Sequence, residues 1–137
     1  MLIYRVEDKS HDGLHRGGYY NLYCDYLSLD KYNVKKIPPP QDEPHMGFRS
    51  WFGSQYGAGL GEDIRFGFES IEMLRRWIPS KRGRAYIQEH GAMLMVYQTL
   101  PQYCKIGTTQ LVFRLSKSQP LHRLCLADTK TLLFTLS

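Results

Sequence analysis

Five cations stand within ten residues of this sequence, and they are the side chains best suited to hold a large charged partner. They are Arg75, Arg76, Lys81, Arg82 and Arg84. No aspartate or glutamate lies among them, and their summed charge equals the formal net charge of the whole chain, +5. Such a basic patch attracts phosphate backbones or an acidic protein surface. A solvated helix face followed by a turn gives the same pattern.

Tyrosines supply a second group of possible contact residues. The segment 19–32 contains five of them, at Tyr19, Tyr20, Tyr23, Tyr26 and Tyr32. Tyrosine rings can stack on nucleic-acid bases. The spacing of Tyr19, Tyr23 and Tyr26 also fits the apolar face of a short amphipathic helix. We therefore expect a helix here, with its tyrosines packing against the core and their hydroxyls at the rim.

The segment 34–61 lacks a regular pattern and is rich in proline and glycine. A loop of this length in a compact domain is usually functional or disordered, and its aromatic residues argue against disorder. We expect a structured lid over a groove, with Trp51 and Tyr56 adding to the binding surface. The run 57–61 has glycines spaced as in a phosphate loop, but it follows no clear strand, lacks a Lys-Ser/Thr ending and leads into two acidic residues.

The spacing of histidines and cysteines in the sequence does not favour a metal site. His11 and His15 are four residues apart, but no helical pattern brings them together and no cysteine lies nearby. His122 and Cys125 are three apart in a predicted strand, which places them on opposite faces. We therefore expect no metal site.

Length and composition indicate one cytoplasmic domain. With 137 residues the chain can bury a core without disulfides. Three widely spaced cysteines are an odd number and do not fit a secreted disulfide framework. No run of eighteen apolar residues occurs, and the N-terminus lacks the apolar region of a signal peptide. We expect no membrane partner.

The elements that must position these residues are organised around the segment 64–78. Phe66 and Phe68 alternate around Gly67, as in a strand. Ser70 then stands where a helix N-cap is expected, and Pro79 ends the helix. This strand followed by a capped helix places the two arginines of the basic patch at the end of the helix.

The remaining patterns complete an α+β domain over residues 1–137. Predicted strands are 2–7, 92–100, 108–115, 121–126 and 131–136, and a second helix runs from Ser80 to His90, with Gly83 weakening it. The strand 92–100 is apolar on both faces and should be central. Arg5 shares a face of the first strand with Ile3 and Glu7; if it points outward it is an ordinary surface cation. The order predicts a single domain with a largely antiparallel sheet and two or three short helices.

Several short motifs resemble a family of small uncharacterised phage and prophage proteins. They are Tyr4-Arg5-Val6, the run from Phe66 to Leu74 with Trp77, Gly91 before a strand that ends at Tyr97, and the run from Gln110 to Phe113. This layout also resembles the ADP-ribosyltransferase fold, in which a split sheet clamps NAD. In that fold a first-strand Arg or His holds the cofactor, a Ser or Tyr braces the nicotinamide side, and a later glutamate stabilises the sugar cation.

By position, that resemblance implies Arg5, Ser70 and Gln110 as the site, with NAD as cofactor. Glutamine carries no charge to stabilise an oxocarbenium-like sugar. A unit charge about 4 Å away is worth about 4 kcal/mol at an effective dielectric of about 20, or about a thousandfold in rate. Unless Glu69 or Glu7 fills the role, the resemblance implies a scaffold without catalytic residues and without a cofactor.

These observations lead to three hypotheses. The first is a non-enzymatic phage or mobile-element protein that binds and modulates a host protein or nucleoprotein complex, as an anti-defence or anti-CRISPR inhibitor does, through the basic patch. The second is an active NAD-dependent ADP-ribosyltransferase that modifies a host target. The third is a protein that binds nucleic acid directly through tyrosine stacking and the basic helix end. If a phage encodes the chain, the compartment is the host cytoplasm.

Overall fold

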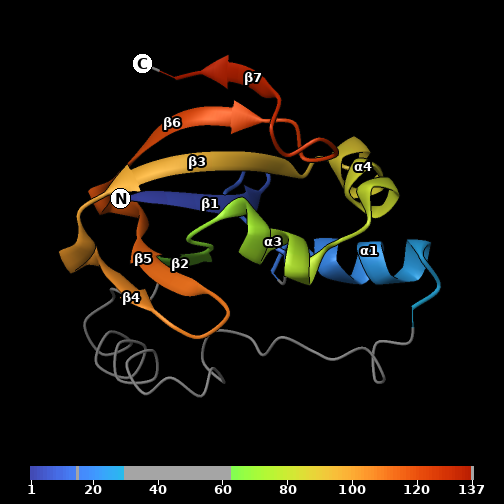
Figure 1. Ribbon diagram of the computed structural model, residues 1–137, viewed down its shortest axis with the longest axis horizontal. Helices are drawn as coiled ribbons and strands as arrows, with labels where there is room; N and C mark the ends of the chain where they lie inside the picture. Colours follow the sequence, from blue (N-terminus) through green and yellow to red (C-terminus); the bar gives the residue numbers. More distant parts are fainter. Residues whose placement is uncertain (15, 30–62, 137) are drawn as a thin grey trace.

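The computed structural model describes residues 1–14, 16–29 and 63–136 (Figure 1). In this part of the chain the helices are α1 (Tyr19–Tyr26), α3 (Ile71–Trp77) and α4 (Lys81–Glu89). The strands are β1 (Leu2–Glu7), β2 (Ile64–Gly67), β3 (Met93–Thr99), β4 (Cys104–Ile106), β5 (Leu111–Arg114), β6 (Ser118–Leu124) and β7 (Leu132–Thr135), with short 3-10 turns η3 (Pro101–Tyr103) and η4 (Leu115–Lys117). The predicted α+β class is confirmed. The expected lid over 34–61, with Trp51 and Tyr56, lies outside the described residues.

Two antiparallel sheets meet at one short bridge. The larger sheet has the order β1-β3-β6-β7, and the smaller has the order β2-β5-β4. Tyr4 in β1 and Phe68, just after β2, exchange backbone hydrogen bonds of 2.9 and 2.8 Å. The two sheets are therefore linked between β1 and the segment before α3, and the predicted antiparallel pairing is divided between two sheets.

The strand β3 occupies the interior of the larger sheet, as its apolar pattern predicts. It pairs with β1 on one side and β6 on the other. Leu94 and Val6 face the three helices, in a core that also contains Leu74, Trp77 and Ile87. On the opposite face lies a second core beneath the smaller sheet, formed by Ile3, Met95, Tyr97, Cys104, Leu111 and Phe113. A strand covered on both faces must be apolar on both faces, which explains the continuous run in β3.

Serine caps set the starts of α3 and α4. The Ser70 hydroxyl accepts a hydrogen bond from the Met73 amide at 3.2 Å, and the Ser80 hydroxyl accepts one from the Gly83 amide at 3.1 Å. Each cap satisfies an amide that has no partner within its helix. Both predicted helix starts are therefore confirmed, and the chain between the two caps is only a short connection around Pro79.

Two strands begin three residues away from their predicted starts, and one strand was not predicted. The strand expected over 108–115 begins only at Leu111, because the Gly107 amide donates to the Gln110 carbonyl at 2.8 Å and closes a hairpin there. That hairpin adds the strand β4. With only three residues, β4 is too short to show a periodic pattern in the sequence. The strand expected over 121–126 begins earlier, at Ser118, because its N-terminal half pairs with the end of β3.

The strand β7 forms one edge of the larger sheet and is exposed on both faces. Leu132, Leu133 and Phe134 are 52%, 43% and 57% exposed. In Figure 1 this strand lies at the rim of the molecule, furthest from the smaller sheet. The predicted strand is present, but unlike β3 it contributes little to the core.

Gly83 fixes how closely α1 and α4 approach. A Cβ atom at this position would lie 2.3 Å from Cε2 of the Tyr23 ring, so the ring occupies the space that any other side chain would need. The interpretation of Gly83 as a residue that only weakens the helix is therefore incomplete. Glycine at position 83 lowers the stability of α4 by itself, but it also leaves the space in which α4 packs against Tyr23 of α1.

We expect Gly83→Ala to destabilise the protein by about 1–3 kcal/mol, because overpacking outweighs the gain of about 1 kcal/mol that alanine brings to a helix interior. Urea denaturation followed by circular dichroism measures this difference. A more stable Gly83→Ala variant would show that helix propensity decides the sign and that the Tyr23 contact is not close.

Candidate functional site

Arg5 is buried beneath the smaller sheet and the loop that follows β1. Its side chain is 2% exposed. Its Nη1 donates to the Phe66 carbonyl at 2.5 Å and its Nη2 to the His11 carbonyl at 2.9 Å. The guanidinium also lies 5.5 Å from the centre of the Phe66 ring. Burial lowers the pKa of Arg5 to about 10. The alternative of an outward surface cation is therefore wrong: Arg5 ties the loop and β2 to β1.

Glu7 supplies a carboxylate on the same face of β1. It is 1% exposed, and its Oε1 lies 3.8 Å from Nε of Arg5. The Tyr97 hydroxyl donates to Oε1, and the ring of His11 contacts Oε2 through Nδ1. Burial and then the hydrogen bond to Glu7 raise the pKa of Tyr97. A buried charge pair is stable only when its remaining polar atoms are also paired, and here Tyr97 and His11 pair both carboxylate oxygens.

The described residues around Arg5 do not fit NAD. The cavity beside Arg5 has a volume of about 100 Å³, whereas sites for small ligands occupy roughly 300–1,000 Å³. Among the described residues that line it, Ser70, Glu69 and Gln110 do not appear. Ser70 is the cap of α3, Glu69 is exposed, and Gln110 is 1% exposed in the hairpin before β5. Glu7 does stand beside Arg5, but the cavity that the described residues form there is smaller than a dinucleotide site.

The basic patch separates into surface residues and one core residue. Arg76, Lys81 and Arg82 are exposed and Arg75 is half-buried; we call these four the cationic surface. Arg84 is only 4% exposed. It donates to the carbonyls of Leu126, Ile78, Pro79 and Ala127 at 3.0, 2.9, 2.8 and 3.1 Å, and burial lowers its pKa. The expectation that Arg84 contacts a partner is therefore wrong, because its guanidinium holds the 126–127 loop against the helices.

The cationic surface lies where α3 ends and α4 begins. Arg75 and Arg76 occupy the last turn of α3, where the negative end of the helix dipole favours cations. Lys81 and Arg82 occupy the first turn of α4, where the dipole disfavours them. A nearby carboxylate is that of Asp128, whose pKa is lowered by hydrogen bonds from Thr131 and the Lys130 amide and also by the charges of Lys81 and Arg75.

Two stacked tyrosines, Tyr86 of α4 and Tyr26 of α1, continue this surface. The rings of Tyr26 and Tyr86 stack with centroids 4.2 Å apart and planes 9° from parallel. Tyr26 is 41% exposed, and Tyr86 follows Arg82 by four residues on the same helix face. Tyr19 and Tyr23, in contrast, are buried in the helix core. The helical interpretation of the 19–26 tyrosines is confirmed, and Tyr26 is the member of that set whose ring reaches the surface beside α4.

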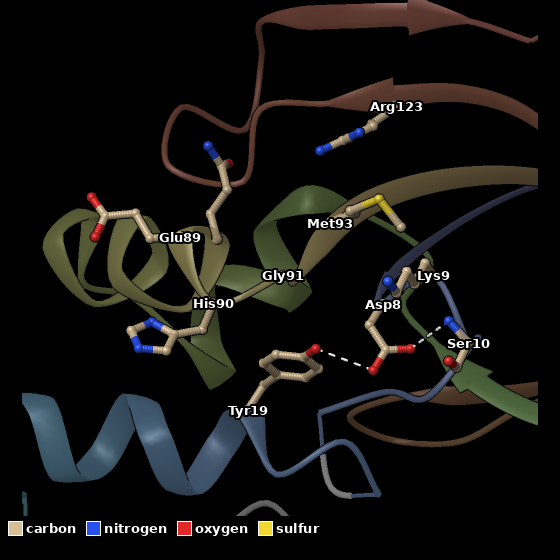
Figure 2. A pocket seen from close by; sticks show the side chains of 10 residues that line it. Asp8, Lys9, Ser10, Tyr19, Glu89, His90, Gly91, Met93 and Arg123 are labelled. Carbon is tan, nitrogen blue, oxygen red and sulfur yellow. Dashed lines mark hydrogen bonds between the residues drawn. The ribbon is translucent and has the colours of Figure 1, made fainter.

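A larger cavity opens between the start of α1, the end of α4 and the larger sheet (Figure 2). Its volume is about 570 Å³. Asp8 accepts hydrogen bonds there from the Tyr19 hydroxyl at 3.1 Å and the Ser10 amide at 2.8 Å. Burial alone would raise the pKa of Asp8, but hydrogen bonds lower it overall. Figure 2 shows the Arg123 guanidinium above Met93 at one side of the cavity. Sequence reasoning missed this cavity because its residues are scattered along the chain.

Arg84→Lys should destabilise the protein by about 2–4 kcal/mol, because lysine keeps the charge but cannot reach four carbonyls with one ammonium group. Arg82→Lys is the matched control on the same helix and should change the free energy of unfolding by less than about 0.5 kcal/mol. Urea denaturation of both variants tests this. Equal stabilities would show that Arg84 is not a core residue.

The stability of the protein at alkaline pH tests the hydrogen bond from Tyr97 to Glu7. Because burial and the Glu7 hydrogen bond raise the folded-state pKa of Tyr97 above its ordinary value of 10.0, its contribution to stability is complete below that pH and is lost as the pH rises beyond it. Between pH of about 8 and 11, the free energy of unfolding should therefore fall more steeply in the wild-type protein than in Tyr97→Phe. Burial also raises the pKa of Tyr20 and Cys104, but these residues act equally in both proteins. Parallel pH curves would contradict the buried Tyr97 to Glu7 contact.

The chain was compared with protein families, with curated proteins and with solved structures. No curated protein and no solved structure matches the chain. Among the described residues, no helix is long and apolar enough to cross a membrane, and no group of three or more His, Cys, Asp or Glu could hold a metal ion. A family model described as the Bacteriophage T4 Y00F protein matches residues 1–127. The chain therefore belongs to this bacteriophage protein family.

Proposed function

We propose that this phage protein binds a host nucleoprotein complex through its cationic surface and thereby modulates that complex. The observation that supports this proposal is the position of Lys81 and Arg82 in the first turn of α4. Each charge there opposes the helix dipole and costs the helix about 0.3–1 kcal/mol. A pair of exposed cations that reduces the stability of its own helix is better explained by a partner than by the fold.

The geometry favours an anion held at several points. Arg75 and Arg76 end α3 only a few residues before Lys81 and Arg82 begin α4, so four cations meet at one junction. The N-terminal amides of α4 add positive potential at the same place. Phosphate groups along a nucleic-acid backbone carry the charge density that such a surface attracts.

The stacked tyrosines support a nucleic-acid component rather than an acidic protein surface alone. Tyr86, one turn after Arg82 in α4, stacks with Tyr26 at the end of α1, and the Tyr26 side chain is 41% exposed. Bases stack on such rings, and each stack contributes about 1–3 kcal/mol. Backbone contacts through Arg82 and stacking on Tyr26 can therefore act on the same strand.

A host nucleoprotein of a defence system, such as a CRISPR effector, is a target that presents this chemistry, and a phage gains from inhibiting it. This is the anti-defence form of the proposal. Direct binding of free nucleic acid is the simpler form, and it uses the same residues. The two differ in whether a host protein is required for tight binding.

Reversing the charges of Lys81 and Arg82 should abolish tight binding without harming the fold. In the variant Lys81→Glu/Arg82→Glu, two carboxylates enter the first turn of α4, where the dipole stabilises them. We expect the affinity for a labelled single-stranded or double-stranded oligonucleotide to fall at least tenfold. The slope of log K against log salt concentration should shrink by about 2, because two phosphate contacts are lost.

The matched control is Lys105→Glu/Lys117→Glu, which changes the net charge equally at two exposed positions, in β4 and η4. This control should reduce the affinity only slightly, and the reduction should be smaller still at high salt. Equal losses in the two variants would mean that net charge alone drives binding. Purification of the tagged protein from host lysate, with and without nuclease, then separates a nucleoprotein partner from free nucleic acid.

A further inference from the structure

The contact between Glu7 and His11 orients an exposed imidazole. The Glu7 carboxylate is buried, and its Oε2 contacts Nδ1 of His11 at hydrogen-bond distance. A carboxylate can only accept, so Nδ1 carries the proton and donates it. In the neutral ring, Nε2 then holds a lone pair. The His11 side chain is 53% exposed, and Nε2 is the ring nitrogen that the contact with Glu7 leaves open.

The backbone holds His11 in an unusual conformation. Its φ angle is 63°, in the left-handed region that non-glycine residues seldom adopt. Such a conformation costs about 1–3 kcal/mol and persists when surrounding contacts determine it. Here the His11 carbonyl accepts from Arg5 Nη2 at 2.9 Å while its ring donates to Glu7. The buried charge pair therefore fixes both ends of the residue.

The imidazole borders a cavity that is large enough for a small molecule. Its volume is about 400 Å³, within the range of ligand sites. Besides His11 it is lined mainly by apolar atoms, from Met95, Tyr97, Leu115, Pro120 and Leu136, and by Ser118, whose hydroxyl donates to the Leu115 carbonyl at 2.7 Å. The Tyr97 hydroxyl is already committed to Glu7. His11 is therefore the residue of this lining with a nitrogen lone pair and a carboxylate behind it.

We propose that His11 is a catalytic general base and that Glu7, Tyr97 and Arg5 are its positioning residues. The substrate class is a small, uncharged ester with an apolar acyl or alcohol part that fits the cavity. Nε2 takes a proton from a water molecule as the water oxygen forms a bond to the ester carbonyl carbon. The tetrahedral intermediate then breaks its bond to the leaving oxygen. The imidazolium returns its proton to that oxygen, so an acid and an alcohol are released and the ring is neutral again.

The role of Glu7 follows from the charge that develops on His11. The ring becomes positive when it accepts the proton, and a carboxylate in direct contact stabilises that positive charge. Because the carboxylate is buried, solvent screens this interaction little. The Tyr97 hydroxyl and the Arg5 guanidinium keep the carboxylate in place, so their effect on the rate is indirect.

A second exposed histidine, His90, serves as a comparison for His11. His90 is also exposed, and its Nδ1 is held at 2.9 Å by a backbone carbonyl, that of Tyr86, instead of a carboxylate. It lines the 570 Å³ cavity of Figure 2 rather than the 400 Å³ cavity of His11. The two imidazoles therefore present the same free nitrogen, and the carboxylate and the surrounding cavity distinguish them.

Hydrolysis of p-nitrophenyl acetate by the full-length protein tests the proposal. The variant His11→Asn removes the imidazole but keeps a residue type that tolerates a positive φ angle. We expect His11→Asn to lower kcat/KM at least tenfold, within the usual range for a lost general base, and His90→Asn to leave it unchanged. The wild-type rate should saturate with substrate concentration. Equal rates in the two variants, or a rate that never saturates and matches that of free imidazole, would overturn the proposal.

The test of the positioning residues needs a measurement that would not change if these residues only supported the fold. Tyr97→Phe should lower kcat several-fold with little change in KM, because the ring that lines the cavity remains. Glu7→Gln should lower kcat further, and it should also slow acylation of His11 by diethyl pyrocarbonate, detected by peptide mass spectrometry, while the acylation of His90 is unchanged. If Glu7→Gln does not fold, Tyr97→Phe still decides: an unaltered kcat would contradict the positioning network.

Discussion

The buried contact between Arg5 and Glu7 is the constraint on which the rest of the structure depends. Two opposite charges on one face of β1 lose their water on folding, and hydrogen bonds from neighbouring groups must offset that loss, because the Nε of Arg5 faces Glu7 at 3.8 Å without a hydrogen bond. Arg5 therefore binds carbonyls of β2 and of the loop after β1. Glu7 binds Tyr97 on β3 and His11 on that loop. The hydrogen bonds required by one ion pair join both sheets and fix the loop.

The regular elements could be predicted because their signals are local. Ser70 and Ser80 precede helical patterns, and each hydroxyl caps its own helix. The double-faced apolar pattern of β3 follows from its position between two cores. The position of the exposed cations was also predictable, since the order of strand, helix and helix leaves the ends of α3 and α4 adjacent. In each case the residues that decide the structure are neighbours in the sequence.

The remaining features depend on contacts between distant segments. A charge count cannot separate Arg84 from Arg82, because the carbonyls of the 126–127 loop that bury Arg84 come more than forty residues later. Gly83 appears as a helix defect until Tyr23 is seen in the space beside it. Glu7 and His11 are only four residues apart, but a loop with a positive φ angle, which no periodic pattern predicts, brings them together. The resemblance to the ADP-ribosyltransferase fold implies its site residues from their order along the chain, and order does not fix which side chains share a cavity.

The burial of Arg84 also affects how this sequence can diverge. Selection on position 84 comes from the fold itself, because four backbone carbonyls accept from one guanidinium. Lys81 and Arg82 lie on an exposed face. Neighbouring positions with the same type of charge are therefore under different structural constraints, and a substitution at position 81 or 82 disturbs the packing of the fold less than a substitution at position 84.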